Sequence, residues 1–438
     1  MQRFPFLALL TLTLVSPAAL SRAAEAAVKP RVVLTAATER ADAIYRRGET
    51  ITFVLRVTLD DRPADSGEIV WSLTKDGLPL AGGGRAKVQR GQATVTGVLG
   101  EPGFVQCKAS YQVGDTKVNA VAGAGVAPLE IKPSLAAPAD FDAFWAEQKK
   151  ALAAVPMNPR VTTVKAPRAG VDTADVQLDS VGAPVSGYYA QPAGAAPRSL
   201  PAILTVHGAG VSSSSLSGPA GWARDGAIAM DINAHGLPNG QPADYYAKLA
   251  AGELKDYRAL GRESRDTVYF RGMILRLIRA IDFLTAQNEW DGLTLVVFGS
   301  SQGGLQAIAA AGLDSRVSFF VAGVPAGNDH TGSLVNRIAG WPKFIPTGEK
   351  PSAAVLGAVP YYDGVNFAAR AKVPGFFTVG FIDTTCPPSS VYAAYNALTA
   401  PKDIFNDIPS GHTNSPAARD AMRAAVLGHF AAQRRAAK

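Results

Sequence analysis

The stretch from Leu295 to Ala311 constrains the fold more than any other part of the chain. It opens with apolar, largely β-branched residues, continues as Gly-Ser-Ser-Gln-Gly, and ends in an Ala-rich run. This order predicts a strand, a sharp turn and a helix. In a nucleophile elbow, such a turn raises a serine Oγ to the top of a sheet at a helix N-terminus. The flanking glycines leave the room that a tight turn around Ser301 requires. An ordinary Gly/Ser-rich turn is the alternative, and the flanking strand and helix patterns argue against it.

Residues further along the chain favour the nucleophile. In enzymes with this elbow, an acid and then a histidine follow the serine. Of the five histidines, His412 and His429 lie near the C-terminus. His429 sits in a helical pattern, whereas His412 follows a Pro-Ser-Gly loop, so His412 is the predicted general base. Asp383 ends the apolar run 375–382 and is the predicted acid, with a turn or helix-capping role as its alternative.

An acyl-transfer site also needs donors for the oxyanion, each worth about 3 kcal/mol in comparable enzymes. The first should be the backbone N–H of Gln302, which follows the nucleophile. The apolar run 201–206 then ends in His-Gly-Ala-Gly, a pattern expected after the third strand. We therefore expect the backbone N–H of Ala209 to be the second donor. His207 precedes Ser301 in the chain and is expected to be structural.

Four segments share a further pattern: Asp140 to Trp145, Gly299 to Gly304, Tyr361 to Ala368, and Val379 to Asn396. In these segments the chain resembles the cephalosporin C deacetylase and acetyl xylan esterase family of α/β-hydrolases. The resemblance covers roughly Pro138 to the C-terminus. It implies an α/β-hydrolase fold and activity on short acyl esters, acetyl above all, on sugars or similar alcohols. It implies no metal and no organic cofactor.

Two positions depart from the family pattern. The family usually carries Arg-Gly-Gln upstream of the elbow, where this chain has Arg-Gly-Met ending at Met273. It also usually has Glu after the catalytic histidine, where this chain has Thr413. In the family both positions lie near the catalytic centre, and the predicted triad is kept.

The 438 residues, 47% hydrophobic and 18% charged, are enough for two domains with sizeable cores. Residues 1–23 read as a signal peptide, with a short basic start, an apolar stretch and small residues before a cleavage point after Ala23. A folded N-terminal helix is the alternative. The signal predicts a periplasmic or secreted protein, and no later segment is apolar for long enough to span a membrane.

The charge of +7 is spread thinly, which argues against a nucleic-acid partner.

Short alternating strands in residues 28–127 predict an immunoglobulin-like antiparallel β-sandwich, with turns at 60–63, 75–77 and 82–84. This unit could bind carbohydrate, or it could pack on the second domain and shape its cleft. The second role is favoured because no exposed aromatic platform is recognisable. Residues 128–137 are the expected connector.

Residues 138–438 alternate between strand and helix patterns, which predicts a mostly parallel sheet covered on both faces. Two irregular inserts, 233–265 and 327–360, should lie near the active site. Cys107 and Cys386 are the only cysteines. Export would permit a disulfide between them, although two free thiols are the favoured interpretation. The sequence leaves open whether the chain is a monomer or a homo-oligomer.

Three functional classes compete. A secreted serine ester hydrolase acting on a small-molecule or carbohydrate ester, most simply an acetyl ester, is favoured. A serine peptidase of the same fold shares the triad chemistry, but no peptidase-type N-terminal domain is recognisable. A binding protein on an inactive hydrolase fold is disfavoured by the intact Ser301, Asp383 and His412.

Overall fold

The computed structural model describes Met1 and residues 31–436. Apart from Met1, the predicted signal peptide lies outside the described residues. Within the described part of the chain, every helix is too short or too polar to cross a lipid bilayer.

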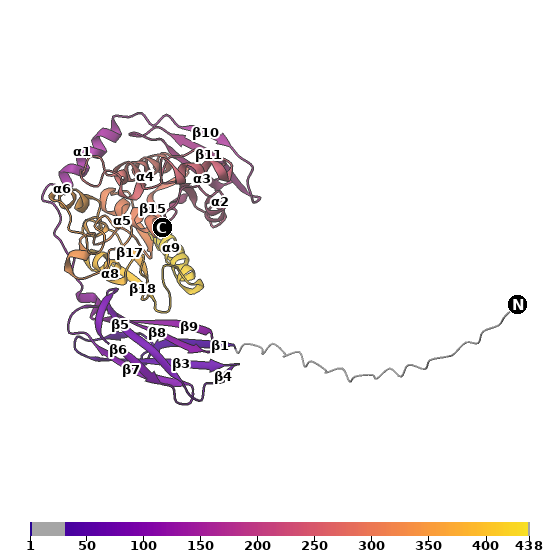
Figure 1. Ribbon diagram of the computed structural model, residues 1–438. Helices are drawn as coiled ribbons and strands as arrows, with labels where there is room; N and C mark the ends of the chain where they lie inside the picture. The colour runs from indigo at the N-terminus through magenta and orange to yellow at the C-terminus, as the bar shows by residue number, and fades with distance from the viewer. Residues whose placement is uncertain (2–30, 437–438) are drawn as a thin grey trace.

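Two sheets form the N-terminal part, drawn in indigo and violet in Figure 1. The first contains β1 (Val32–Thr38), β3 (Thr50–Leu59), β4 (Arg62–Pro63) and β7 (Gln92–Val98). The second runs in the order β2 (Ile44–Tyr45), β9 (Thr116–Val126), β8 (Gly103–Val113), β5 (Glu68–Lys75) and β6 (Leu78–Lys87). The strand pairs are antiparallel except β2–β9, which is parallel.

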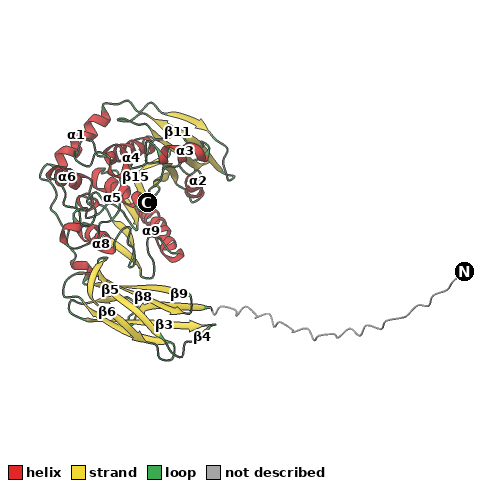
Figure 2. Ribbon diagram, viewed as in Figure 1, coloured by secondary structure: helices red, strands yellow, loops and turns green. Residues whose placement is uncertain are grey.

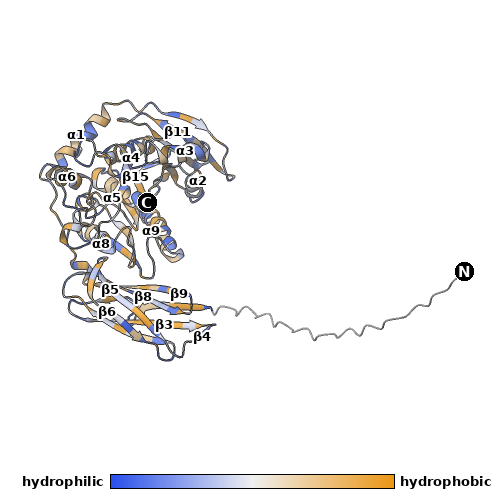
Figure 3. Ribbon diagram, in the orientation of Figure 1, coloured by the Kyte–Doolittle hydropathy of each residue, from blue (hydrophilic) through white to orange (hydrophobic). Residues whose placement is uncertain are grey.

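Alternating side chains of β3 and β7, together with a more continuously buried stretch of β8, build the core between these sheets. Phe53 and Leu55 of β3 point inward together with Val105 and Cys107 of β8, and all four are fully buried. The strands of this part change between orange and blue along their length in Figure 3, as half-buried strands do. The predicted turn at residues 82–84 is wrong. Those glycines lie inside β6, beside a register shift between β5 and β6, so they mark an irregular strand.

The connector contains the short 3-10 helix η1 (Pro128–Glu130). Beyond it, nine strands form one sheet, most readily seen in yellow in Figure 2. In order across the sheet they are β10 (Arg160–Thr163), β11 (Val171–Leu178), β12 (Val185–Pro192), β14 (Ile228–Ile232), β13 (Leu200–Val206), β15 (Trp290–Ser300), β16 (Phe319–Gly323), β17 (Gly375–Gly380) and β18 (Lys402–Asp407). The pairs from β14 to β18 are parallel, and those from β10 to β14 are antiparallel.

The central strand β15 is buried on both faces, which explains its continuous apolar sequence. Leu295 and Val297 face a core formed with α4 (Tyr269–Thr285) and α5 (Gln302–Leu313). Val296 faces the opposite core, formed with α2 (Ser217–Arg224) and α9 (Pro416–Ala436). The sheet is therefore covered by helices on both faces, as predicted.

The remaining helices lie in the connections. They are α1 (Phe141–Ala153), α3 (Ala243–Ala251), η2 (Tyr257–Ala259), η3 (Gly332–Val335), α6 (Ala353–Ala358), η4 (Val359–Tyr362), α7 (Gly364–Ala368) and α8 (Pro388–Ala397). The insert 233–265, predicted to be irregular, thus contains a helix of nine residues and a 3-10 turn.

The two-sheet part packs against the end of the nine-stranded sheet next to α8 and β18 (Figure 1). The Gln106 side chain donates from Nε2 to the Phe381 carbonyl at 3.1 Å, and the Phe104 ring meets the Phe381 ring edge-on at 5.0 Å. Gly123 lies so close that a Cβ there would stand 2.6 Å from the Phe381 oxygen. Because Phe381 is two residues before Asp383, this contact reaches the predicted acid.

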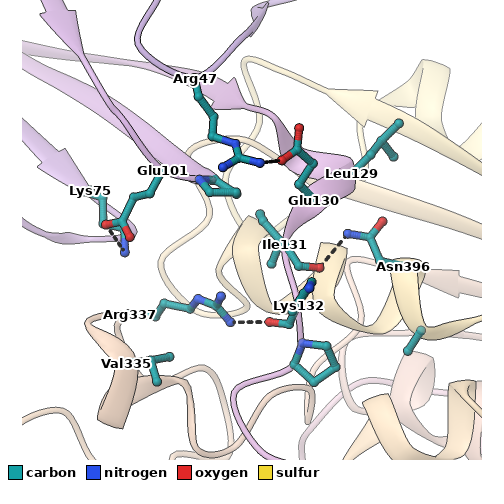
Figure 4. A pocket seen from close by; sticks show the side chains of 13 residues that line it. Arg47, Lys75, Glu101, Leu129, Glu130, Ile131, Lys132, Val335, Arg337 and Asn396 are labelled. Carbon is teal, nitrogen blue, oxygen red and sulfur yellow. Dashed lines mark hydrogen bonds and ion pairs between the residues drawn. The ribbon is translucent and has the colours of Figure 1, made fainter.

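A cavity of about 750 Å³ lies in the same junction (Figure 4). Its charged side chains are largely paired with one another, as in the Arg47–Glu130 and Lys75–Glu101 ion pairs. On its other side, the Arg337 side chain donates to the Lys132 carbonyl at 3.1 Å. The cavity is thus bounded by the two-sheet part, the connector and the segment after η3.

Candidate active site

Ser301 occupies the turn between β15 and α5, as the motif predicts. Its backbone has φ 56° and ψ −122°, a conformation that L-residues rarely adopt. A Cβ on Gly303 would lie 2.2 Å from the Val206 carbonyl oxygen, and a Cβ on Gly299 would lie 2.4 Å from the Gly303 backbone. The two glycines therefore let α5 approach β13 and β15, and this close packing holds Ser301 in its strained turn.

The structure brings together the three residues that the sequence singled out. The Ser301 Oγ lies 2.9 Å from His412 Nε2, and His412 Nδ1 lies 2.8 Å from Asp383 Oδ2. The Asp383 side chain is 1% exposed, whereas the His412 side chain is 27% exposed. A carboxylate can only accept, so Nδ1 carries a proton and Nε2 is free to accept the Ser301 hydroxyl proton.

Backbone amides hold the Asp383 carboxylate in place. The Thr385 and Cys386 N–H groups donate to Oδ1 at 2.7 and 2.9 Å, which leaves Oδ2 for His412. The acid loop is itself anchored, because the Trp341 N–H donates to the Thr385 carbonyl at 2.7 Å. The carboxylate is thus oriented by its own loop before any substrate arrives.

Asn414 fixes the loop that carries His412, a role that the sequence pattern did not indicate. Its Nδ2 donates to Ser300 Oγ at 3.1 Å, and its Oδ1 accepts from the Thr378 hydroxyl. Thr413 lies at the exposed surface, and its backbone N–H donates to Gly411 O at 2.9 Å. Asn414 therefore ties the histidine loop to the ends of β15 and β17.

The predicted oxyanion donors belong to the two segments next to Ser301, the start of α5 and the loop after β13. Gln302 is the first residue of α5, so its N–H has no acceptor within the helix. Ala209 follows Gly208, where a Cβ would lie only 3.6 Å from the Ser301 Cβ. The Gly208 carbonyl is 2.7 Å from His207 Nδ1. Because a trans peptide places C=O and N–H on opposite sides, this contact turns the Ala209 N–H away from His207.

Sequence reasoning missed a buried group behind these donors. His235 Nε2 lies 3.0 Å from the Gly210 carbonyl, and the Tyr257 hydroxyl donates to Gln302 Oε1 at 2.7 Å. Burial lowers the pKa of His235 to about 4 and raises that of Tyr257 to about 12. Both side chains come from the insert 233–265, where no motif marks them.

Both cysteines are free and buried, in agreement with the favoured prediction. Burial raises the pKa of the Cys107 thiol to about 12 and raises that of Cys386 well above its ordinary value. Among the described residues, the grouping that could hold a metal ion consists of Asp383, Cys386 and His412, whose ligand atoms lie within 4.8 Å of one another. Within this group His412 Nδ1 bonds Asp383 Oδ2, and the Cys386 backbone N–H bonds Asp383 Oδ1.

The departure at Met273 falls on a core position. Its side chain is fully buried in α4, within the hydrophobic cluster on one face of the sheet. A thioether at this place fills space and supplies no strong hydrogen bond to the site.

Comparison with known proteins places the chain in a family. The model of the acetyl xylan esterase (AXE1) family matches residues 129–420. The acetyl esterase Axe7A of Xylanibacter ruminicola is 30% identical over 373 residues, which cover 83% of each chain. An acetyl xylan esterase from Paenibacillus sp. R4 superposes with a TM-score of 0.60 at 29% identity, covering 69% of this chain and 98% of its own.

A second solved structure supports the fold. Acetyl xylan esterase 1 from Thermoanaerobacterium sp. JW/SL YS485 gives a TM-score of 0.58 at 22% identity, with coverage of 69% and 97%. The chain belongs to the acetyl xylan esterase (AXE1) family of carboxylic ester hydrolases.

Proposed function

We propose that this chain is an exported serine esterase that removes acetyl groups from carbohydrates through an acyl-enzyme intermediate. The observation that carries the proposal is the hydrogen-bonded series of Ser301, His412 and Asp383 at a nucleophile elbow. Family membership supports the reaction class, and the names of the relatives support acetyl as the acyl group.

In the first half-reaction, Ser301 Oγ attacks the ester carbonyl carbon while His412 Nε2 takes the hydroxyl proton. The tetrahedral intermediate then collapses. Its bond to the alcohol oxygen breaks, and His412 gives the proton to the leaving alcohol. Asp383 keeps the imidazole in the required tautomer and stabilises the imidazolium. The product of this half-reaction is acetyl-Ser301 and a free sugar hydroxyl.

In the second half-reaction, His412 takes a proton from water as the water oxygen attacks the acetyl carbon. Collapse breaks the bond to Ser301 Oγ, which recovers its proton from His412, and acetate leaves. In both halves the negative oxygen lies between the N–H groups of Gln302 and Ala209. Such preorganised donors act only on the charge that develops in the transition state.

The same proposal covers organisation and location. Residues 1–23 are a signal peptide, 28–127 an immunoglobulin-like sandwich domain, 128–137 a connector and 138–438 the catalytic domain. The sequence of the first segment supports export to the periplasm or beyond. The contacts of Gln106 and Phe104 with Phe381 support a sandwich that packs on the catalytic domain and shapes the site.

The test compares the wild type with Ser301→Ala, using Ser199→Ala as a matched control at an exposed position. The substrates are p-nitrophenyl acetate, longer p-nitrophenyl esters, acetylated xylan and aminoacyl amides. We expect Ser301→Ala to lose nearly all activity and an organophosphonate to label the wild type at Ser301 alone. Label on another serine would overturn the nucleophile. Preference for long-chain esters would overturn deacetylation, and preference for amides would favour a peptidase.

A further inference from the structure

A cluster of aromatic side chains bonds Gly210 and the Gln302 side chain, next to the two proposed oxyanion donors, and the reaction steps above do not use it. It consists of His235, which follows β14, Tyr257 of η2 and Tyr269 at the start of α4. His235 is 4% exposed and Tyr257 is 7% exposed. The His235 ring meets the Tyr257 ring edge-on at 4.6 Å, and Tyr257 lies 5.3 Å from Tyr269.

Hydrogen bonds determine the tautomer of His235. Nε2 lies 3.0 Å from the Gly210 carbonyl, and Nδ1 lies 2.7 Å from the Tyr269 hydroxyl. A carbonyl can only accept, so Nε2 carries the proton and Nδ1 accepts from Tyr269. A neutral imidazole offers one donor and one acceptor, and both are used here. Burial and the nearby Arg276 guanidinium keep the pKa of His235 at about 4, so the ring stays neutral at neutral pH.

The partner of His235 belongs to the loop that carries Ala209. Gly210 has φ 146°, a conformation that favours glycine. In the described part of the chain, the hydrogen bond from His235 to the Gly210 carbonyl is the one that holds residues 209–212, and the next bond along the loop is made by Ser213. Without it the Gly210 carbonyl would lose its protein partner.

The same cluster reaches the other donor. The Tyr257 hydroxyl donates to the side-chain oxygen of Gln302 at 2.7 Å, and Gln302 is fully buried. The Gly210 backbone also lies near enough to the Tyr257 hydroxyl to lower the pKa of Tyr257, against the larger effect of burial. The Tyr257 ring also meets His235, which bonds the Gly210 carbonyl, so Tyr257 links Gln302 to the loop that carries Ala209.

The base of the cluster is rigid. Arg276, 4% exposed, donates from Nε and Nη2 to the Ala234 carbonyl at 3.1 and 2.6 Å. The Asn233 side chain accepts from the His235 and Leu237 backbone N–H groups at 3.3 and 2.9 Å. Hydrogen bonds thus hold the backbone on both sides of His235, and the bonds to Tyr269 and Gly210 orient its ring.

From these contacts we infer that His235 is a positioning residue for catalysis, which holds the Ala209–Gly210 loop so that its N–H faces the oxyanion. Tyr257 couples this loop to Gln302, so one buried scaffold sets both donors. The inference rests on the proposed function, because it assigns the support of the proposed oxyanion hole. Neither residue touches the reacting atoms.

The test replaces His235 by two side chains of similar size. In His235→Gln the amide can donate to Gly210 and accept from Tyr269, whereas in His235→Leu both hydrogen bonds are lost. Removing one oxyanion donor in comparable enzymes lowers kcat by about 10²–10³-fold. For p-nitrophenyl acetate we expect His235→Leu to lower kcat at least about tenfold with KM within about twofold, and His235→Gln to stay within about threefold of wild type.

Two further measurements separate positioning from general packing. A boronic acid, whose adduct with serine places an oxygen in the oxyanion hole, should bind His235→Leu more weakly in proportion to the loss of kcat. Tyr246→Phe removes another tyrosine hydroxyl of the same insert, one that donates to Pro238 O, and should leave kcat unchanged.

Wild-type kcat in His235→Leu would overturn the inference. So would equal losses in the Leu and Gln variants, or a fall in kcat with unaltered boronic acid binding. Ser301→Ala keeps the two proposals apart. If that variant is inactive and His235→Leu is not, only the positioning role fails, whereas an active Ser301→Ala overturns the proposed function itself.

Discussion

Ser301 combines two properties that rarely coincide in one residue. Its backbone is strained, and its side chain lies 2.9 Å from an imidazole nitrogen at a helix N-terminus. Strain of this kind costs about 1–3 kcal/mol and persists only where the surroundings hold it. Here Ser301 N–H donates to Gly323 O at 2.8 Å, and Ser301 O accepts from Ala326 N–H at 3.0 Å. The turn is therefore held by the strand beside it.

At the same scale, the base and the acid should behave as parts of one unit. We expect His412→Ala to lower kcat about 10⁶-fold and Asp383→Asn about 10⁴-fold, because each leaves Ser301 without a correctly oriented base. The measurement is hydrolysis of p-nitrophenyl acetate. His429→Gln serves as the control. His429 lies on α9, and its Nε2 is 2.9 Å from Ser318 Oγ instead of near Ser301. Similar losses in the control and in His412→Ala would mean that the base is wrongly assigned.

His235 should also make stability depend on pH. Burial lowers the pKa of His235 from 6.5 to about 4. Between these two pH values the unfolded chain is protonated at His235, whereas the folded chain is not. Stability from this group is therefore complete above pH 6.5 and declines by up to about 3 kcal/mol as the pH falls to about 4. His235→Gln has no such proton. Between pH 7 and 4.5, the Tm of wild type should fall more steeply than that of the variant, and parallel curves would contradict this expectation.

At the scale of elements, the elbow depends on how closely α5 can approach the sheet. A Cβ on Gly303 would meet the Val206 oxygen at 2.2 Å, and backbone cannot yield as a side chain can. We expect Gly303→Ala to lower the free energy of unfolding by more than about 3 kcal/mol or to prevent folding.

The matched control for this prediction is Gly428→Ala in α9, where a Cβ meets open space. Alanine there should raise the free energy of unfolding by about 0.5–1 kcal/mol, because glycine is a poor helix former. Urea unfolding of the two variants provides the measurement. A stable, active Gly303→Ala would show that the elbow tolerates a wider gap between helix and strand.

Elements with a strong local pattern were predictable from the sequence. The hydrophobic pattern predicted the strand β15 and the Ala-rich helix α5. Chain order and loop context predicted Asp383 and His412. The site depends on more than pattern, however. Asn414 and His235 lie in loops and Tyr257 in the short helix η2, and only the fold brings them next to the segments around the nucleophile.

Some differences had signals that were available. The helix α3 in the predicted irregular insert follows Pro242, is rich in Ala and ends before Gly252, which is a recognisable helix signature. At the glycines 82–84, by contrast, the sequence alone could not distinguish the two possible structures. Glycine clusters mark turns and irregular strands alike, and pairing with β5 decides between the two.

For the whole molecule, the contact between the two-sheet part and the acid loop links the N-terminal strands to the chemistry. The β5–β6 turn touches the segment after η3, because Ile338 N–H donates to Asp76 O at 2.9 Å. That segment holds the acid loop through Trp341 and Thr385. A deletion of residues before Pro128 would also expose the fully buried Phe381, so loss of folding would obscure any effect on substrate choice.

A single substitution tests this link without that difficulty. Gln106→Leu leaves the buried Phe381 carbonyl without its partner, which costs about 1–3 kcal/mol and loosens the strand end two residues before Asp383. Since every substrate needs Asp383, we expect kcat to fall by the same factor, about threefold to tenfold, on p-nitrophenyl acetate and on acetylated xylan. Gln112→Leu, on the exposed end of the same strand, is the matched control and should leave both rates unchanged. A loss confined to acetylated xylan would assign the N-terminal part to substrate binding. Unchanged rates on both substrates would mean that the Gln106–Phe381 contact contributes to packing and not to catalysis.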